Sequence, residues 1–157
     1  MIEFIFSAIG GIVIYYLILH YMPKSIKVKI DEFGANRAYN SATKKLEQTI
    51  EKEREELKTE KVDKKLAEEN YQDLWDAKKE ANETREKFLK LSERFKHDTK
   101  KFYEVTADWK DYTKFFADWV DGRCAEYVEP DFEHVKEINI RSQEIIKRYD
   151  KLITHKA

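Results

Sequence analysis

A long run without glycine or proline, from Ala42 to Val120, constrains this chain more than any other feature. The whole sequence has only 4 glycines and 2 prolines, and 39% of its residues are charged. Turns favour those two residue types, whereas Glu, Lys, Arg, Ala and Leu favour helices. The sequence therefore predicts an all-α fold with few loops, in which a single helix of about 80 residues would reach roughly 120 Å.

The N-terminal segment Ile2–Met22 is almost entirely apolar, and only Glu3 and His20 in it are ionisable. A helix of this length spans roughly 31 Å, which matches the hydrocarbon core of a bilayer. The acidic start and the bulky end of the segment differ from the basic start and small-residue cleavage site of a secretory signal peptide. Residues 1–23 are therefore predicted to form a single transmembrane anchor in a lipid bilayer.

Basic residues predict the orientation of this anchor. None precedes it, whereas Lys24, Lys27 and Lys29 follow it closely. Positive charge favours the cytoplasmic side, so we expect a single-pass protein with its N-terminus outside and its C-terminal arm cytoplasmic. A single cysteine, Cys124, is consistent with a reducing compartment.

Five residues are candidates for contacts of the anchor. Aromatic rings favour the headgroup zone, and small residues let two helices approach closely, although small residues are common in such helices anyway. The interfacial candidates are Tyr15, Tyr16 and Tyr21, and the small-residue pair is Ser7 and Gly11.

Two segments are expected between the anchor and the rest of the chain. Residues 24–40 are predicted to be a juxtamembrane linker, because Ile26–Ile30 alternates apolar and basic residues. Residues 41–87 are predicted to be a charged helical stalk, because their apolar positions are sparse. Pairs such as Glu83 and Lys87 would add only about 0.2–0.5 kcal/mol each to such a helix.

From residue 88 onwards, apolar residues recur in alternate steps of three and four, which indicates a buried helical seam. Asp98 interrupts the first run, and the stretch from Gly122 to Pro130 separates it from a second run. The predicted seam residues are Phe88, Leu91, Phe95, Phe102, Val105, Trp109, Tyr112, Phe116, Trp119, Val135, Ile138, Ile145, Tyr149 and Leu152.

The large aromatic residues of this seam do not suit a two-stranded parallel zipper. Residues 88–157 are therefore predicted to form an antiparallel, coiled-coil-like hairpin with Trp109 opposite Ser142 and Phe102 opposite Tyr149. A lone hairpin would leave one side of its aromatic row in water. Two hairpins joined as a four-helix bundle would cover it, so we expect a homo-oligomer, with a dimer favoured.

Few residues form patterns that carry chemistry. The four histidines are scattered, and Cys124 has no cysteine partner, so no metal or cofactor is predicted. Charges balance at 30 basic and 31 acidic residues, so no nucleic-acid partner is expected. The repeated pairs Asp108-Trp109 and Asp118-Trp119 could hold a cation, although core packing explains the tryptophans better.

These features predict a non-enzymatic, membrane-anchored coiled-coil scaffold or tether that oligomerises and recruits a partner. The alternative is an accessory structural subunit of a large multi-protein membrane complex, whose aromatic seam packs on other chains. The oligomeric state of residues 24–157 distinguishes the two hypotheses. A defined oligomer favours the scaffold, and a monomer with an exposed apolar surface favours the subunit.

Overall fold

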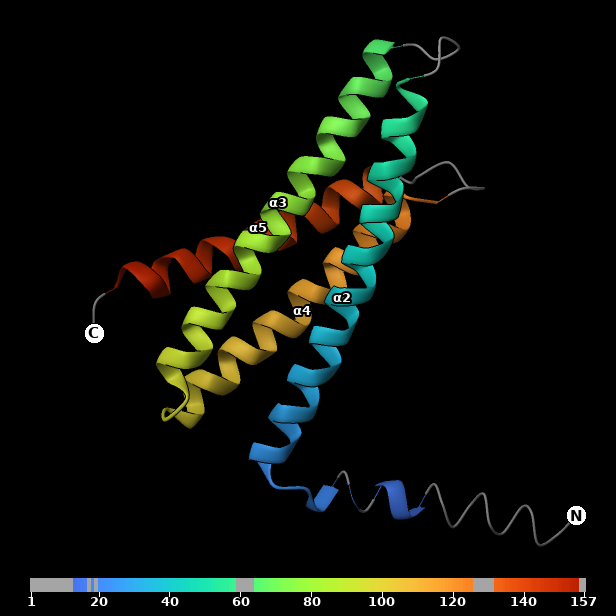
Figure 1. Ribbon diagram of the computed structural model, residues 1–157. Coiled ribbons are helices and arrows are strands. Elements are labelled where there is room, and N and C mark those ends of the chain that lie inside the picture. Colours follow the sequence, from blue (N-terminus) through green and yellow to red (C-terminus); the bar gives the residue numbers. More distant parts are fainter. Residues whose placement is uncertain (1–12, 17, 19, 59–63, 126–131, 156–157) are drawn as a thin grey trace, which may run out of the picture.

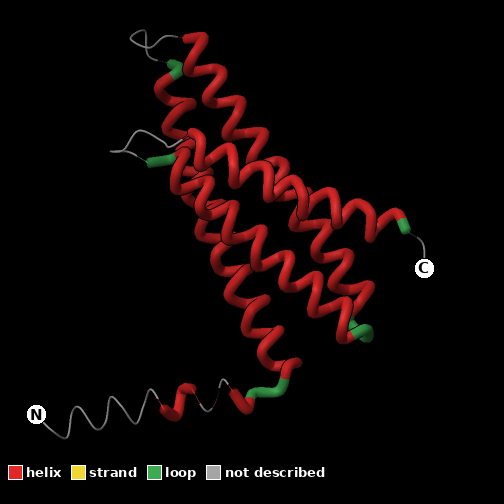
Figure 2. Tube along the Cα trace, turned by 180° about the vertical axis from the view of Figure 1, so that it is seen from behind, coloured by secondary structure: helices red, strands yellow, loops and turns green. Residues whose placement is uncertain are grey.

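The structure is a computed structural model that describes residues 13–16, 18, 20–58, 64–125 and 132–155. It contains the helices α2 (Lys24–Glu56), α3 (Lys64–Phe95), α4 (Thr99–Arg123) and α5 (Phe132–Thr154) (Figure 1). Figure 2, seen from behind, shows loops only near the ends of the long helices. The all-α prediction is confirmed.

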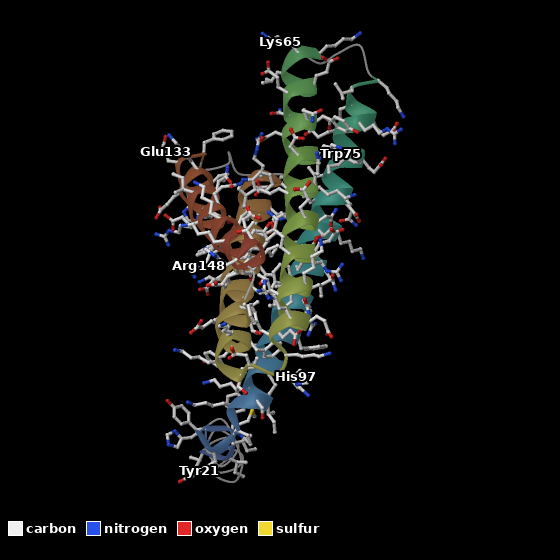
Figure 3. All side chains as sticks on the ribbon, turned by 90° about the vertical axis from the view of Figure 1, so that its left-hand side faces the viewer. Tyr21, Lys65, Trp75, His97, Glu133 and Arg148 are labelled. Atoms are coloured by element: carbon white, nitrogen blue, oxygen red, sulfur yellow. The ribbon has the colours of Figure 1, made fainter. Side chains whose placement is uncertain are left out.

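The four long helices fold back on one another as a bundle. Lys45 on α2 pairs with Asp121 at 2.7 Å, and Lys110 on α4 pairs with Asp31 at 2.8 Å. Asp31 precedes Lys45 in α2, and their partners Lys110 and Asp121 follow in the same order in α4. The two helices therefore run parallel. α4 also contacts α3 and α5. In the side view of Figure 3, α5 and α2 lie on opposite sides of the bundle.

Contacts between α3 and α5 follow the same parallel pattern. Lys87 pairs with Asp150 at 2.8 Å, and Gln143 donates a hydrogen bond to Glu80 at 2.5 Å. α3 runs antiparallel to α2 and α4 (Figure 1). Each of the four helices therefore packs against at least one parallel and one antiparallel helix. α4 is central in this arrangement, so its side chains are covered on three sides.

Asp98 marks the chain reversal between α3 and α4. Its carboxylate accepts a hydrogen bond from the backbone N–H of Lys101 at 3.1 Å, and its φ of −100° and ψ of 89° are not helical. An Asp at this N-cap position satisfies one of the free amides that begin a helix. The residue that interrupts the predicted seam is therefore a helix cap, and the reversal needs neither glycine nor proline.

The predicted stalk and linker are both wrong. Residues 24–40 form the first half of α2, and residues 41–56 and 64–87 lie in α2 and α3, which pack against each other. Four of the nine buried apolar residues of these faces are alanines, so the apolar pattern was too weak to be recognised. The buried residues of these faces are Val28, Ala35, Tyr39, Ala42, Leu46, Ile50, Ala67, Leu74 and Ala81.

The predicted seam is buried, except that Phe102, Trp119 and Leu152 are half-buried. Its centre is Trp109, whose ring stacks on Phe88 with the centroids 4.7 Å apart and the planes at 8°. The indole N–H donates to Asn36 Oδ1 at 3.0 Å, so the polar group of this buried ring is satisfied. The core therefore joins α2, α3 and α4 around one tryptophan.

The antiparallel α4–α5 pair agrees with the second part of the predicted hairpin, but residues 88–95 belong to α3 instead, and the register of the pair differs. The Tyr149 hydroxyl donates to the carbonyl oxygen of Val105 at 3.1 Å. The predicted neighbour was Phe102, which lies about one helical turn away. The four-helix bundle expected from two chains forms within one chain, because α2 and α3 cover the aromatic row. The original reason for a homo-oligomer is thereby removed.

No helix in the described residues is both long and apolar enough to span a membrane. This finding overturns the predicted transmembrane anchor and, with it, the single-pass localisation with a cytoplasmic arm. The long helices carry charged residues along their outer faces, which is why none of them qualifies. Ser7 and Gly11 lie outside the described residues, while Tyr15, Tyr16 and Tyr21 are exposed.

Two helical glycines differ in the space around them, which leads to a testable difference in stability. A Cβ added at Gly34 would meet nothing within 4 Å, whereas one at Gly122 would lie 3.0 Å from Val135 Cγ2. We expect Gly34→Ala to raise the free energy of unfolding by about 0.5–1 kcal/mol, because alanine favours helices. Gly122→Ala should lose that gain, because the methyl group crowds α5.

Chemical denaturation of the two variants beside the unmodified chain measures this difference. Equal stabilisation by both substitutions would contradict the close approach of α4 and α5 at Gly122.

Candidate interaction surface

An apolar stripe lies exposed on the first turns of α2. Its members are Ile26, Ile30 and Phe33, whose exposed fractions are 47%, 51% and 71%. Steps of four and three residues bring these side chains to one face of a helix. Val28, only 4% exposed, faces the bundle on the opposite side. α2 is therefore apolar on two faces here, and only one of them is covered by the rest of the bundle.

Basic residues surround this apolar stripe. Lys27 and Lys29 lie on its two sides, and Arg37 follows Phe33 by one helical turn. In the described part of the chain, none of these three side chains forms an ion pair or hydrogen bond. The stripe thus combines apolar area with a net positive charge, because Glu32 can offset only one of these three cations. The open space beside Gly34 permits close approach.

The remaining surface of the bundle is mostly charged, and several of its charged side chains form ion pairs with one another. Charged side chains cover the outer faces in Figure 3, where Trp75 and Arg148 lie on different sides of the bundle. Arg148 pairs with Asp108 across α4 and α5, and Arg123 pairs with Asp73 at 2.7 Å. Such exposed pairs typically contribute little stability. These pairs neutralise part of the surface, whereas the cations beside the α2 stripe have no such partners in the described residues.

An acidic hollow of 160 Å³ between α3, α4 and α5 is the second feature of interest. Its carboxylates all have partners, including Asp76, which accepts from Gln72 at 3.0 Å, and Glu80, which accepts from Gln143 at 2.5 Å. Burial raises the pKa of Glu80, and the hydrogen bond from Gln143 opposes that shift. The carboxylates of this hollow are therefore paired with other side chains of the same chain.

The predicted seam residues are buried or half-buried within the bundle of one chain. Trp109 and Tyr112 are buried, and burial raises the pKa of the Tyr112 and Tyr149 hydroxyls, which stay neutral. Trp119, half-buried, lines the acidic hollow. These positions support the bundle, as the periodicity predicted.

The Asp108-Trp109 pair does not form a cation cage around its tryptophan. Asp108 turns toward Arg148 on α5, whereas the Trp109 indole donates to Asn36 on α2. Burial raises the pKa of Asp108, and the Arg148 guanidinium opposes the shift. The two side chains thus face different neighbours.

Groups that carry chemistry are scattered in the described part of the chain. No group of three or more His, Cys, Asp or Glu side chains there is arranged to hold a metal ion. Cys124 lies in the core, and burial raises the pKa of its thiol, so it stays protonated.

No protein-family model, curated protein or solved structure matches this chain. Sequence reasoning also missed the α2 stripe, because the alternation in Ile26–Ile30 was interpreted as a linker. The spacing of Ile26, Ile30 and Phe33 by four and three residues is typical of one helix face and could have indicated the stripe.

Proposed function

We propose that this chain is a non-enzymatic helical-bundle subunit that docks onto another protein through the α2 stripe. The observation that carries this proposal is the exposure of Ile26, Ile30 and Phe33 on one face of a helix whose other face is packed. An amphipathic helix commonly binds by laying such spaced residues into an apolar groove or against a second helix. Of the two hypotheses from the sequence, an accessory subunit that packs on other chains fits this surface best.

Charge complementarity predicts the chemistry of the partner. Lys27, Lys29 and Arg37 flank the stripe without internal partners in the described chain. An apolar surface bordered by Asp and Glu would bury the stripe and neutralise these cations. A second copy meeting the same stripe would bring like charges together, which opposes self-association through this face. The partner is therefore a different protein with an acidic border.

A designed peptide tests this proposal directly. The probe is an amphipathic helical peptide with a leucine seam flanked by glutamates, and its control has lysines in place of those glutamates. The full chain should bind the glutamate peptide and not the lysine peptide, and binding should weaken as salt increases. Fluorescence anisotropy of the labelled peptides measures both affinities.

Two triple variants make the test specific. Ile26→Ser, Ile30→Ser and Phe33→Ser together should weaken binding at least about tenfold, which corresponds to about 1.4 kcal/mol. The matched control replaces the exposed residues Leu66, Leu89 and Ile140 with serine and should bind as the unmodified chain does. Equal binding by both variants would reject the stripe as the docking surface. A dimer in sedimentation equilibrium that the stripe variant abolishes would favour the self-associating scaffold instead.

A further inference from the structure

A hollow of 600 Å³ lies where α2 and α4 begin. It is larger than two other hollows, of 390 Å³ and 190 Å³, that share Tyr103 with it as a lining residue. α2 contributes Lys24, Lys27 and Val28 to its wall, and α4 contributes the residues that follow the Asp98 cap. The hollow lies beside the α2 stripe and shares Lys27 with its border, but Val28 faces away from Ile26, Ile30 and Phe33.

Positive charge dominates this hollow. Lys24, Lys27 and Lys100 line it, and none of them forms an ion pair in the described residues. The neighbouring Lys101 differs, because it lies 3.9 Å from Asp98. Glu104 is the one carboxylate in the wall, so the lining carries two more positive than negative charges.

The start of α4 adds hydrogen-bond donors to the same place. Thr99 and Lys100 are the first two residues of this 25-residue helix, and both line the hollow. Amides at these positions have no acceptor inside the helix, and the helix dipole is positive at this end. The Asp98 carboxylate accepts from the amide of Lys101, one residue further along. The lysines and the helix end therefore favour an anion together.

Apolar groups form the remaining wall. Val28 is buried with 4% of its surface exposed, and the ring of Tyr103 is 43% exposed at the junction of the three hollows. A simple inorganic anion would leave the exposed Tyr103 ring in water. A ligand with an apolar body beside its anionic group would cover it.

We propose that this hollow binds a small amphipathic anion, such as an alkyl or aryl phosphate or carboxylate. The acidic group lies against Lys24, Lys27, Lys100 and the first amides of α4. The apolar body lies along Val28 and Tyr103. The volume suits a ligand of drug-like size, because binding sites of that kind commonly occupy roughly 300–1,000 Å³.

Three probes test the chemical class with the full chain. Octyl phosphate, below its micellar concentration, should bind in isothermal titration calorimetry and shift the amide resonances of Val28, Thr99 and Lys100. Inorganic phosphate should bind more weakly, because it lacks the apolar body. Octyltrimethylammonium should not bind, because its charge is repelled. Equal binding of either comparator would overturn the proposal.

Two variants test the position of the site while leaving Lys27 and the α2 stripe unchanged. The double variant Lys24→Gln and Lys100→Gln should bind octyl phosphate about tenfold more weakly, and Tyr103→Ser should lower the affinity as well. The control double variant Lys64→Gln and Lys114→Gln removes the same charge from exposed positions elsewhere and should keep the affinity. Equal losses in the two double variants would show that net charge alone attracts the ligand and would overturn the site.

Discussion

Replacing Trp109 with alanine is expected to lower the free energy of unfolding by about 3–5 kcal/mol, a large share of the stability of a domain of this size. The indole is 0% exposed and stacks on Phe88 and Tyr112. Its loss leaves a cavity where α2, α3 and α4 meet and leaves Asn36 without its donor. Urea denaturation followed by circular dichroism measures the change.

A second tryptophan provides the control for this experiment. Trp75 is 46% exposed on α3, with Tyr71 stacked at 6.5 Å and the Lys78 ammonium over its ring. Trp75→Ala should therefore cost about 1 kcal/mol or less. If the two alanine variants lost the same stability, Trp109 would not be the centre of the core.

The next largest effect is expected at Leu46, which lies in the segment predicted to be a solvated stalk. Leu46 is 0% exposed in α2 and belongs to the same core as Trp109. We expect Leu46→Ala to lower the free energy of unfolding by about 2–5 kcal/mol, because it opens a cavity in the bundle. The measurement is chemical denaturation of the full chain.

Leu89→Ala is the matched control for Leu46→Ala, since Leu89 is 46% exposed on α3. It should cost about 1 kcal/mol or less. An extended stalk would instead leave Leu46 exposed, so similar small losses at the two positions would contradict the packed α2. The outcome also bears on the α2 stripe and the hollow, because both depend on the position of α2 against α4.

The buried seam could be predicted because its signal is local and strong. Phe88, Trp109 and Tyr149 are large apolar residues in helical steps, and such a pattern reports burial whatever covers it. The antiparallel arrangement of α4 and α5 was also predictable, since Gly122 and Pro130 bound the connection between them. The register was missed by about a turn, because the pattern repeats with each turn and does not select among neighbouring alignments.

The packing of α2 and α3 could not be predicted in the same way. Their inner positions include Ala35, Ala42 and Ala81, which are small and contribute weak periodicity. Alanine at these positions lets helices approach closely, yet it resembles an ordinary helix-forming residue in a charged sequence. The reversal at Asp98 was missed for a related reason, because an N-cap can begin a new helix without glycine or proline.

The sequence by itself determined that this chain is helical and that a band of residues from Phe88 to Leu152 is buried. Both properties depend on features of single helices, namely the helix propensity of the residues and the spacing of the apolar residues. Only the tertiary structure decided what covers that band, because coverage depends on where the chain reverses and which helices then become neighbours. The same packing placed Val28 inside and left Ile26, Ile30 and Phe33 outside, and it brought Lys24 and Lys100 to one hollow from helices far apart in the sequence.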